Sequence, residues 1–207
     1  MEYLSLIILW SLWCVIHSCM ISLKVVNYLK NRLGNYYKFY RIFFNTVALT
    51  TFIPLAIYSR SFKGVVLFSW EGYLTIIQIT LLIFVVFLLI SGGLKYDILQ
   101  FLGIKQIKSG KSHTTLSEIG NLNTSGILGV SRHPWYLAGI ILIWVDSREI
   151  DVSALIVNAI LTIYIVIGTV LEERKLVKEF GDDYLNYQYE VSMLFPFKWI
   201  FKKLSFG

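Results

Sequence analysis

Long runs without a charged side chain restrict the folds that this chain can adopt. Three of them cover residues 3–23, 73–94 and 152–171, and each contains at least 20 residues. A helix needs about 20 apolar residues to cross a hydrocarbon core of about 30 Å, so each run is long enough to span a membrane. A fourth run, 42–59, is slightly shorter, and a fifth covers 134–145. The sequence therefore predicts an all-α, polytopic membrane helical bundle with about five transmembrane helices.

The composition agrees with a membrane protein and argues against a soluble domain. Hydrophobic residues make up 56% of the 207 residues and charged residues 15%. A typical soluble domain has about 25% charged residues. No internal repeat or low-complexity tract divides the chain. We therefore expect a single integral-membrane domain over 1–207, with three helices in 1–94 and the sequence motifs in 122–196.

The distribution of basic residues predicts how the helices cross the membrane. If the first run starts outside and each run crosses once, only Arg60, Lys63 and Arg148 of the 19 basic residues fall on the outer side. This asymmetry follows the positive-inside rule, and it places the N-terminus outside and the C-terminus in the cytoplasm. The net charge of +6 is then explained by a lipid bilayer as the partner, rather than by nucleic acid.

Two segments outside the apolar runs are richer in polar or basic residues than the runs themselves. The connection 95–131 is polar in its centre and contains several glycines, among them Gly126, that would let the backbone approach a ligand closely. Connections of this length are usually functional or disordered. The tail, 195–203, mixes aromatic and basic residues, which predicts an interfacial helix lying on the cytoplasmic leaflet.

The start of the run 134–145 carries the most unusual group of side chains. Pro134 suits the first turn of a helix, because its missing N–H would have no partner there. The helix N-terminus then points its partial positive charge toward Arg132 and His133, which predicts an anion site. Arg132 adds a planar fork that matches a carboxylate. Tyr136 and Gly139 share one helix face, where Gly139 leaves room for a ligand or a crossing helix.

A pair of glutamates, Glu172 and Glu173, follows the last apolar run. With the predicted topology they return to the cytoplasmic side, where Arg132 is expected. A carboxylate there can accept hydrogen bonds from ribose hydroxyls, from an amino group or from Arg132. An equally good interpretation is a solvated helix end, in which Arg174 and Lys175 are the local partners.

Polar side chains also lie in the runs 3–23 and 42–59 or directly before them, on the same expected side of the membrane. His17 is most simply satisfied by a neighbouring helix, Arg41 by reaching the surface, and Asn45 by a hydrogen bond across helices. A shared polar pocket for a substrate is the alternative. The three histidines, His17, His113 and His133, are too scattered in the sequence to indicate a metal site, so none is predicted.

Four motifs follow one another in the C-terminal half of the chain. They are Leu122-Asn123-Thr124-Ser125-Gly126-Ile127, Arg132-His133-Pro134-x-Tyr136-x-x-Gly139, Glu172-Glu173-x-x-Leu176, and Phe180-Gly181-x-x-Tyr184-x-x-Tyr187 followed by Pro196. Their order resembles the isoprenylcysteine carboxyl methyltransferase and phospholipid methyltransferase superfamily. The sequence departs from the superfamily at Leu128, where a tyrosine is usual, and at Gly129, where a basic residue is frequent.

The N-terminal half is similar to a narrower branch, the methanethiol S-methyltransferases and the NnrU-type membrane proteins. The residues that carry this similarity are His17-Ser18, Tyr40-Arg41 with Asn45, and the segment from Tyr96-Asp97 to Gly103-x-x-Gln106.

The resemblance implies an integral-membrane methyltransferase that uses S-adenosyl-L-methionine, bound in a cytoplasmic pocket. The residues implied to bind this cofactor are Gln106, Gly126, His133, Pro134, Tyr136, Gly139, Glu172 and Glu173. Arg132 and Glu173 are the implied catalytic residues, with Arg132 orienting or polarising the acceptor. His17, Arg41 and Asn45 are the candidates for contacting the substrate.

The implied methyl acceptor is a small or lipophilic thiol or an isoprenylcysteine-type carboxylate, and no obligate protein partner is expected. One alternative is an NnrU-like membrane protein without established catalysis. Another is an NADPH enzyme similar to the sterol reductases, which share an Arg-His-Pro segment. In those reductases an asparagine and an acidic residue usually stand at the positions of Trp135 and Ile140, and Glu172-Glu173 favours a methyl donor.

Overall fold

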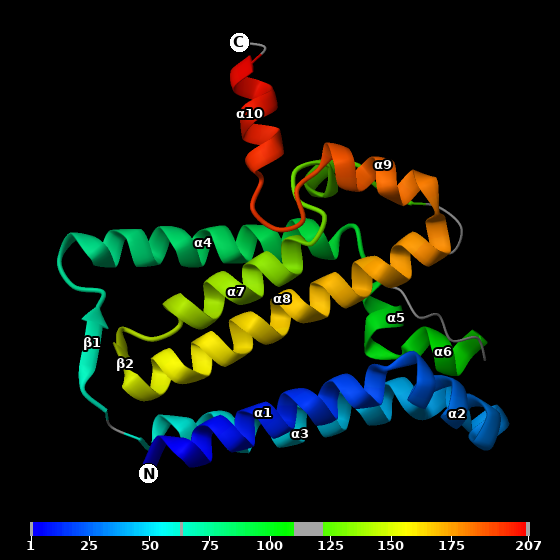
Figure 1. The fold of residues 1–207 in the computed structure, drawn as a ribbon, viewed down its shortest axis with the longest axis horizontal. Coiled ribbons are helices and arrows are strands. Elements are labelled where there is room, and N and C mark those ends of the chain that lie inside the picture. Colours follow the sequence, from blue (N-terminus) through cyan, green and yellow to red (C-terminus); the bar gives the residue numbers. More distant parts are fainter. Residues whose placement is uncertain (1, 63, 110–121, 206–207) are drawn as a thin grey trace. The chain divides into compact units, whose positions relative to one another are not determined.

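The computed structural model describes residues 2–62, 64–109 and 122–205 (Figure 1). The centre of the long connection, 110–121, which includes His113, lies outside them. The chain divides into two compact units. The first is formed by described residues within 2–69, 98–109 and 149–164, and the second by those within 70–97, 122–148 and 165–205. The expectation of one integral-membrane domain stays a prediction.

Helices form nearly all of the regular structure in both units. The elements of the first unit are α1 (Glu2–Ile21), α2 (Leu23–Leu33), η1 (Gly34–Phe39), α3 (Tyr40–Arg60), β1 (Val66–Ser69), α5 (Ile98–Leu102), α6 (Ile104–Ser109), β2 (Glu149–Asp151) and the start of α8 (Val152–Phe180). Those of the second unit are α4 (Tyr73–Gly93), η2 (Gly126–Gly129), α7 (Pro134–Val145), the rest of α8, α9 (Asp182–Glu190) and α10 (Phe197–Ser205).

The prediction of an all-α membrane bundle is confirmed. Among the described residues, four helical stretches are long and apolar enough to cross a membrane: Tyr3–Ile21, Leu23–Arg60, Tyr73–Gly93 and Val152–Phe180. In α4, Ile76, Ile83 and Ile90 follow one another at seven-residue intervals and are each more than 60% exposed. Water would penalise such an apolar stripe, whereas lipid tails would cover it. The chain is therefore an integral membrane protein.

The fifth expected crossing, α7, is shorter than the others. Its 12 residues extend over about 18 Å, which is less than the hydrocarbon core of about 30 Å. A crossing by α7, and with it the orientation of the two termini, stays a prediction.

Two boundaries differ from the predicted ones. Residues before Tyr40, expected as a connection, form α2 and η1, because their basic and tyrosine side chains do not prevent a helix. Helix α8 continues past the last apolar residue to Phe180 and ends where Gly181 adopts a φ of +58°, a conformation that glycine accepts readily. Glu172 and Glu173 therefore lie inside a helix and not at its end.

Buried aromatic contacts join α1 to α3 in the first unit, where the two helices lie side by side (Figure 1). Trp10 is 1% exposed, and its indole N–H donates to Ser59 Oγ at 2.7 Å. The Trp10 ring also meets Phe52 edge-on, with 5.5 Å between the centroids. Trp10 is therefore part of the core between α1 and α3.

A short antiparallel ribbon, which the sequence did not predict, also belongs to this unit. In it Val66 of β1 lies opposite Asp151 of β2, and Ser69 opposite Glu149. The strands have four and three residues, too few for an alternating pattern to be recognised in the sequence.

Asp151 caps helix α8, and this predicts a specific dependence on pH. Its carboxylate accepts from the backbone N–H of Ala154 at 2.8 Å, from Ser153 Oγ at 2.6 Å and from the N–H of Gly64 at 3.1 Å. Partial burial opposes ionisation, but these hydrogen bonds outweigh it and hold the pKa of Asp151 below its ordinary 3.8. The cap is therefore fully stabilising above that pH and is lost as the pH falls through the lower pKa of the folded state.

We expect Asp151→Ala to lower the free energy of unfolding by about 0.5–2 kcal/mol at neutral pH, the usual cost of removing a helix cap. Asp151→Asn keeps the cap and removes the titration, so its stability should change less with pH below 4 than that of the wild type. Thermal unfolding in detergent between pH 3 and 7 measures both effects. Equal pH profiles for wild type and Asp151→Asn would contradict the assignment.

In the second unit α4 and α7 pack side by side (Figure 1). Their contact is centred on a buried cluster of Val85, Leu88, Leu137, Ala138 and Leu194. A second buried cluster, formed by Leu176, Tyr184, Tyr187 and Val191, packs α9 against α8.

Helix α10 is confirmed as a helix, and none of its residues is buried. Its apolar side chains Phe197, Ile200, Phe201 and Leu204 share one face, because they follow the spacing of helical turns. Lys198 attaches the start of the helix to the end of α9 through the carbonyls of Gln188 and Tyr189, both at 2.8 Å. Its position at a membrane surface stays a prediction.

Candidate functional site

The segment before α7 is fixed by backbone pairing with the segment after α9. Ser131 and Ser192 form a parallel bridge. The N–H of Arg132 donates to the Ser192 carbonyl at 3.0 Å, and the N–H of His133 donates to the Met193 carbonyl at 3.1 Å. Both residues of the predicted motif are therefore held in place by backbone hydrogen bonds.

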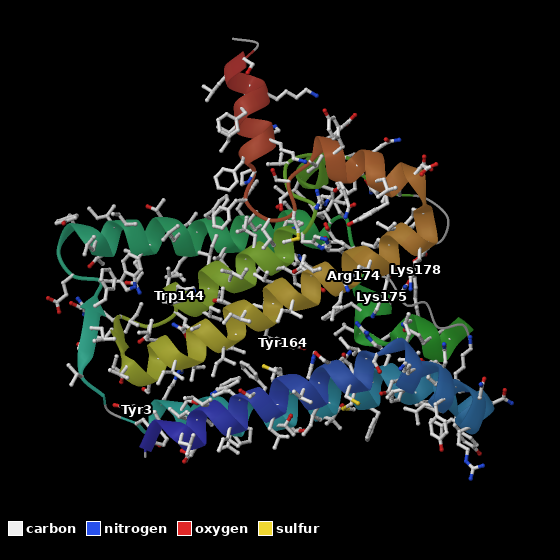
Figure 2. All side chains as sticks on the ribbon, viewed as in Figure 1. Tyr3, Trp144, Tyr164, Arg174, Lys175 and Lys178 are labelled. Carbon is white, nitrogen blue, oxygen red and sulfur yellow. The ribbon has the colours of Figure 1, made fainter. Side chains whose placement is uncertain are left out.

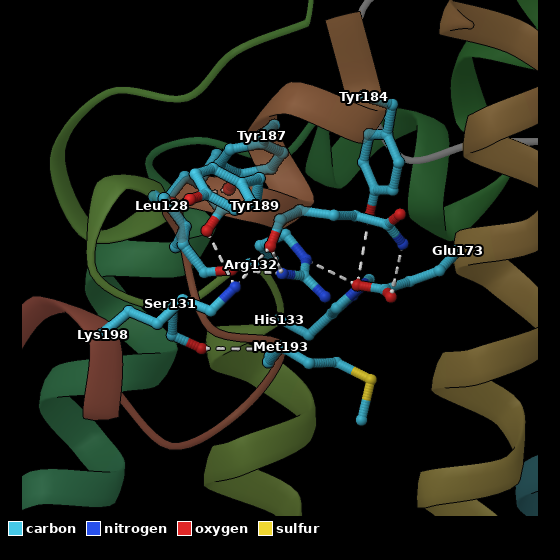
Figure 3. Close-up of polar contacts among 12 residues, drawn as sticks. Leu128, Ser131, Arg132, His133, Glu173, Tyr184, Tyr187, Tyr189, Met193 and Lys198 are labelled. Carbon is cyan, nitrogen blue, oxygen red and sulfur yellow. Dashed lines mark hydrogen bonds and ion pairs between the residues drawn. The ribbon is translucent and has the colours of Figure 1, made fainter. Parts of the chain in front are cut away.

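Arg132 and Glu173 form a buried ion pair (Figure 3). Nε of Arg132 donates to Oε1 of Glu173 at 2.6 Å, and the two residues are 8% and 7% exposed. Nη1 of Arg132 also donates to the carbonyls of Gln188, at 3.1 Å, and of Val191. The guanidinium thus connects the start of α7 with α8 and with the end of α9.

The Glu173 carboxylate has hydrogen bonds at both oxygens (Figure 3). Its Oε1 lies 3.2 Å from Nε2 of His133 and accepts from the Tyr184 hydroxyl at 3.3 Å, in addition to Arg132. Its Oε2 accepts from Nε2 of Gln188 at 2.8 Å. A buried charge is tolerated when it is paired and fully hydrogen-bonded, and Glu173 meets both conditions.

Two tyrosines of α9 act as neutral donors in this network. Burial, and next the Glu173 carboxylate, raise the pKa of Tyr184 well above its usual 10. Burial likewise raises the pKa of Tyr187, whose hydroxyl donates to the Leu128 carbonyl at 2.6 Å. Both phenols therefore stay protonated at physiological pH and keep their hydrogen bonds.

Glu172, the neighbour of Glu173, lies in a different environment. It is half-buried, and its Oε2 accepts a short hydrogen bond from the Tyr136 hydroxyl. The ring of Tyr136 stacks on that of His133, with centroids 5.4 Å apart and planes 19° apart. Within the described residues, Glu172 forms no ion pair.

The local partners considered for a solvated helix end, Arg174 and Lys175, therefore do not neutralise Glu172 (Figure 2 labels both on α8). Arg132 and Glu173 neutralise each other, whereas no cation among the described residues compensates the Glu172 carboxylate. The anion expected at the start of α7 is present in the chain itself, as the Glu173 carboxylate beside Arg132 and His133.

The remaining candidates of the second unit have local structural roles. Pro134 is buried and occupies the first turn of α7, as its sequence position predicted. Gly126 starts η2 with a φ of +66°. A Cβ added at Gly139 would lie 3.7 Å from Cδ1 of Ile165 in α8, so this glycine lies at the contact with a crossing helix.

The other four candidates belong to the first unit. Nε of Arg41 and Nδ2 of Asn45 both donate to the Phe101 carbonyl, at 3.1 and 3.0 Å. His17 does not share this acceptor: its Nδ1 lies 2.5 Å from the hydroxyl of Tyr164. Gln106 is 3% exposed, and its Nε2 donates to the Gln100 carbonyl at 2.9 Å. The predicted site residues are thus divided between the two units, and those of the first unit have three different partners.

Sequence reasoning gave no role to several residues that complete the network in the second unit. Tyr184, Tyr187 and Gln188 lie at helical spacing in α9 and therefore share a face, a signal that the sequence does contain. No spacing within one helix indicated that Tyr96 and Trp135 would contact each other. In the described part of the chain, no group of three or more His, Cys, Asp or Glu side chains is placed to hold a metal ion.

Together these features define an integral-membrane helical protein with a buried Arg–Glu–His network at the start of a short apolar helix. The family described as NnrU protein matches residues 5–182. The chain belongs to this family.

Curated relatives match over shorter segments. A methanethiol S-methyltransferase of Pseudomonas deceptionensis is 42% identical over 77 residues, which are 37% of this chain and 29% of that protein. Methanethiol S-methyltransferase 1 of Bradyrhizobium diazoefficiens is 43% identical over 67 residues, 32% of this chain and 23% of that protein. The matched part of this chain spans less than a third of each of these relatives. No solved structure matches the chain significantly.

Proposed function

We propose that the protein is an integral-membrane methyltransferase that uses S-adenosylmethionine and methylates a small or lipophilic thiol. The observation that carries the proposal is the half-buried Glu172 carboxylate, which Tyr136 holds and which no cation of the described residues neutralises. The names of the partly matching relatives support the same activity and favour a thiol as the acceptor.

The charge of this group suits a methyl donor with a positively charged sulfur. A cation is attracted both by a carboxylate and by the faces of aromatic rings, and the rings of Tyr136 and His133 lie beside Glu172. An anionic dinucleotide such as NADPH would be repelled by the same carboxylate. The residues therefore fit a sulfonium compound better than they fit the cofactor of a reductase.

The side chains of the second unit then have distinct roles. Glu172, Tyr136 and His133 would contact the donor. Arg132 and Glu173 would act on the reaction by positioning, because their hydrogen bonds fix the start of α7 against α8 and α9. Gly126, Pro134 and Gly139 would shape the backbone around these groups.

When bound, S-adenosylmethionine supplies an activated methyl group on sulfur. Methyl transfer is an in-line displacement, so the chain contributes mainly by holding the two reactants in line. A thiol acceptor must lose its proton before it attacks, because the thiolate is the nucleophile. An isoprenylcysteine-type carboxylate would need no base, and it is the second acceptor class to be tested. With the predicted orientation, the donor site faces the cytoplasm.

Binding and methyl-transfer assays on the full chain in detergent test the proposal. Calorimetric titration should detect S-adenosylmethionine and S-adenosylhomocysteine and no NADPH. Tritiated methyl groups should then appear in thiols, when thiols, prenyl-cysteines and phospholipids are compared as acceptors. Binding of NADPH alone would indicate a reductase, and binding of none of the three would leave a member of the NnrU family without this chemistry.

Tyr136→Phe tests the contact that orients Glu172. The variant keeps the ring and loses the hydroxyl, so we expect the Kd for S-adenosylmethionine to rise about tenfold, the effect of one hydrogen bond to a charged group. Tyr73→Phe, at a tyrosine of α4 that is 76% exposed, is the matched control and should bind like the wild type. Equal affinities in both variants would remove Tyr136 from the site.

A further inference from the structure

Tyr96 contacts the first turn of α7, where the group just described begins, and has no role in it so far. It follows the end of α4, where its backbone N–H donates to the Gly92 carbonyl at 3.1 Å. Its ring meets that of Trp135 edge-on, with 5.0 Å between the centroids. Tyr96 is thus attached both to α4 and to the residue that precedes Tyr136 in α7.

The position of Trp135 is itself fixed by α4. Its indole N–H donates to the Leu89 carbonyl at 3.0 Å. A Cβ added at Gly92 would lie only 2.5 Å from Cδ1 of Trp135, so the indole packs directly on a backbone that only glycine leaves open. These contacts make the position of Tyr96 a consequence of how α4 and α7 pack.

The phenol of Tyr96 is half-buried and stays protonated. Burial raises its pKa, and the nearby Glu172 carboxylate and the Tyr187 phenol raise it further. In the described structure the Tyr96 hydroxyl has no hydrogen-bond partner, whereas the Tyr136 hydroxyl is bound to Glu172. An uncommitted aromatic side chain therefore lies within electrostatic range of the uncompensated carboxylate.

We propose, as an extension of the function inferred above, that Tyr96 is a specificity-determining residue of the donor site. With the Tyr136 ring and the Glu172 carboxylate it would favour a positively charged sulfur over a neutral one. The donor carries that charge and its product, the neutral thioether S-adenosylhomocysteine, does not. Loss of the charge during methyl transfer then removes the attraction to the ring and to the carboxylate, which assists release of the product.

The test compares the affinities of S-adenosylmethionine and S-adenosylhomocysteine for the full chain in detergent. In Tyr96→Leu we expect the preference for S-adenosylmethionine over S-adenosylhomocysteine, measured as the ratio of their Kd values, to fall about tenfold. This is the size of a desolvated cation–π contact. Tyr96→Phe keeps the ring and should retain most of the wild-type ratio. Tyr73→Leu is the matched control, because Tyr73 is an exposed tyrosine of the same unit.

A purely structural role of Tyr96 would weaken both ligands equally and leave the ratio unchanged, which would overturn the inference. A ratio that falls as far in Tyr96→Phe as in Tyr96→Leu would overturn the role of the ring. If Tyr96→Leu does not fold, Tyr96→Met supplies the same comparison with an unbranched side chain. If the wild type binds neither ligand, the proposed function itself fails. If it binds both and Tyr96→Leu leaves the ratio of the Kd values unchanged, only the role of Tyr96 fails.

Discussion

Glu173→Ala should lower the free energy of unfolding by about 3–5 kcal/mol, the cost of removing one partner of a buried ion pair. The substitution leaves the Arg132 guanidinium, 8% exposed, without its counter-charge. Tyr184 and Gln188 lose their acceptor at the same time. The effect arises because the desolvated charge on Arg132 remains in place. Unfolding of the detergent-solubilised protein with increasing dodecyl sulfate measures it.

Two controls separate the ion pair from general effects of substitution. Arg174→Ala removes an exposed cation from the next position of α8 and should change stability by less than about 0.5 kcal/mol. The double variant Arg132→Ala with Glu173→Ala should be less destabilised than the sum of the single variants, since no unpaired charge is left. A Glu173→Ala protein as stable as Arg174→Ala would show that the pair does not support the fold.

The membrane helices were predictable because the thickness of a bilayer sets their length. Residues 73–94 were expected and Tyr73–Gly93 is found, while the predicted start of the last run at residue 152 coincides with the first residue of α8. The end of α8 was not predictable in this way. An apolar run stops at the first charge, whereas a helix stops only where its backbone must change, here at Gly181.

The sequence indicated that two of its motifs would meet, but it did not indicate how their side chains pair. The sequence indicated that Arg132 and His133 would meet the two glutamates, and the structure brings them together. The rotation of α8 about its axis decides which glutamate contacts which partner, because consecutive residues of a helix point about 100° apart. Glu173 consequently faces the buried network and Glu172 faces Tyr136. No pattern in one sequence fixes that rotation.

The contacts made by α9 and by the end of α4 were beyond sequence reasoning for a related reason. They depend on where separate elements pack, and not on spacing within one element. The approach of Trp135 to Gly92 is an example, because the indole packs directly on the backbone of a glycine in another helix. Close approaches of this kind hold the Tyr96 ring against Trp135 in the first turn of α7, and they become visible only in three dimensions.

Glu172→Gln should weaken binding of S-adenosylmethionine about 10- to 100-fold while the protein remains as stable as the wild type. Glutamine has nearly the same shape and still accepts a hydrogen bond from Tyr136, so only the charge is lost. An attraction between opposite charges a few ångströms apart near a protein surface is on the order of a few kcal/mol, and each 1.4 kcal/mol changes Kd tenfold. Isothermal titration calorimetry measures the affinity.

The neutral thioether S-adenosylhomocysteine provides the internal comparison, since it lacks the charge that Glu172 would attract and should bind the variant nearly as well as the wild type. Glu190→Gln, at an exposed acidic residue near the end of α9, controls for the change in net charge and should bind both ligands normally. If Glu172→Gln binds S-adenosylmethionine with wild-type affinity, the uncompensated carboxylate is not part of a donor site. The assignment of Arg132 and Glu173 as a stabilising pair would be unaffected, because it depends on burial and not on a ligand.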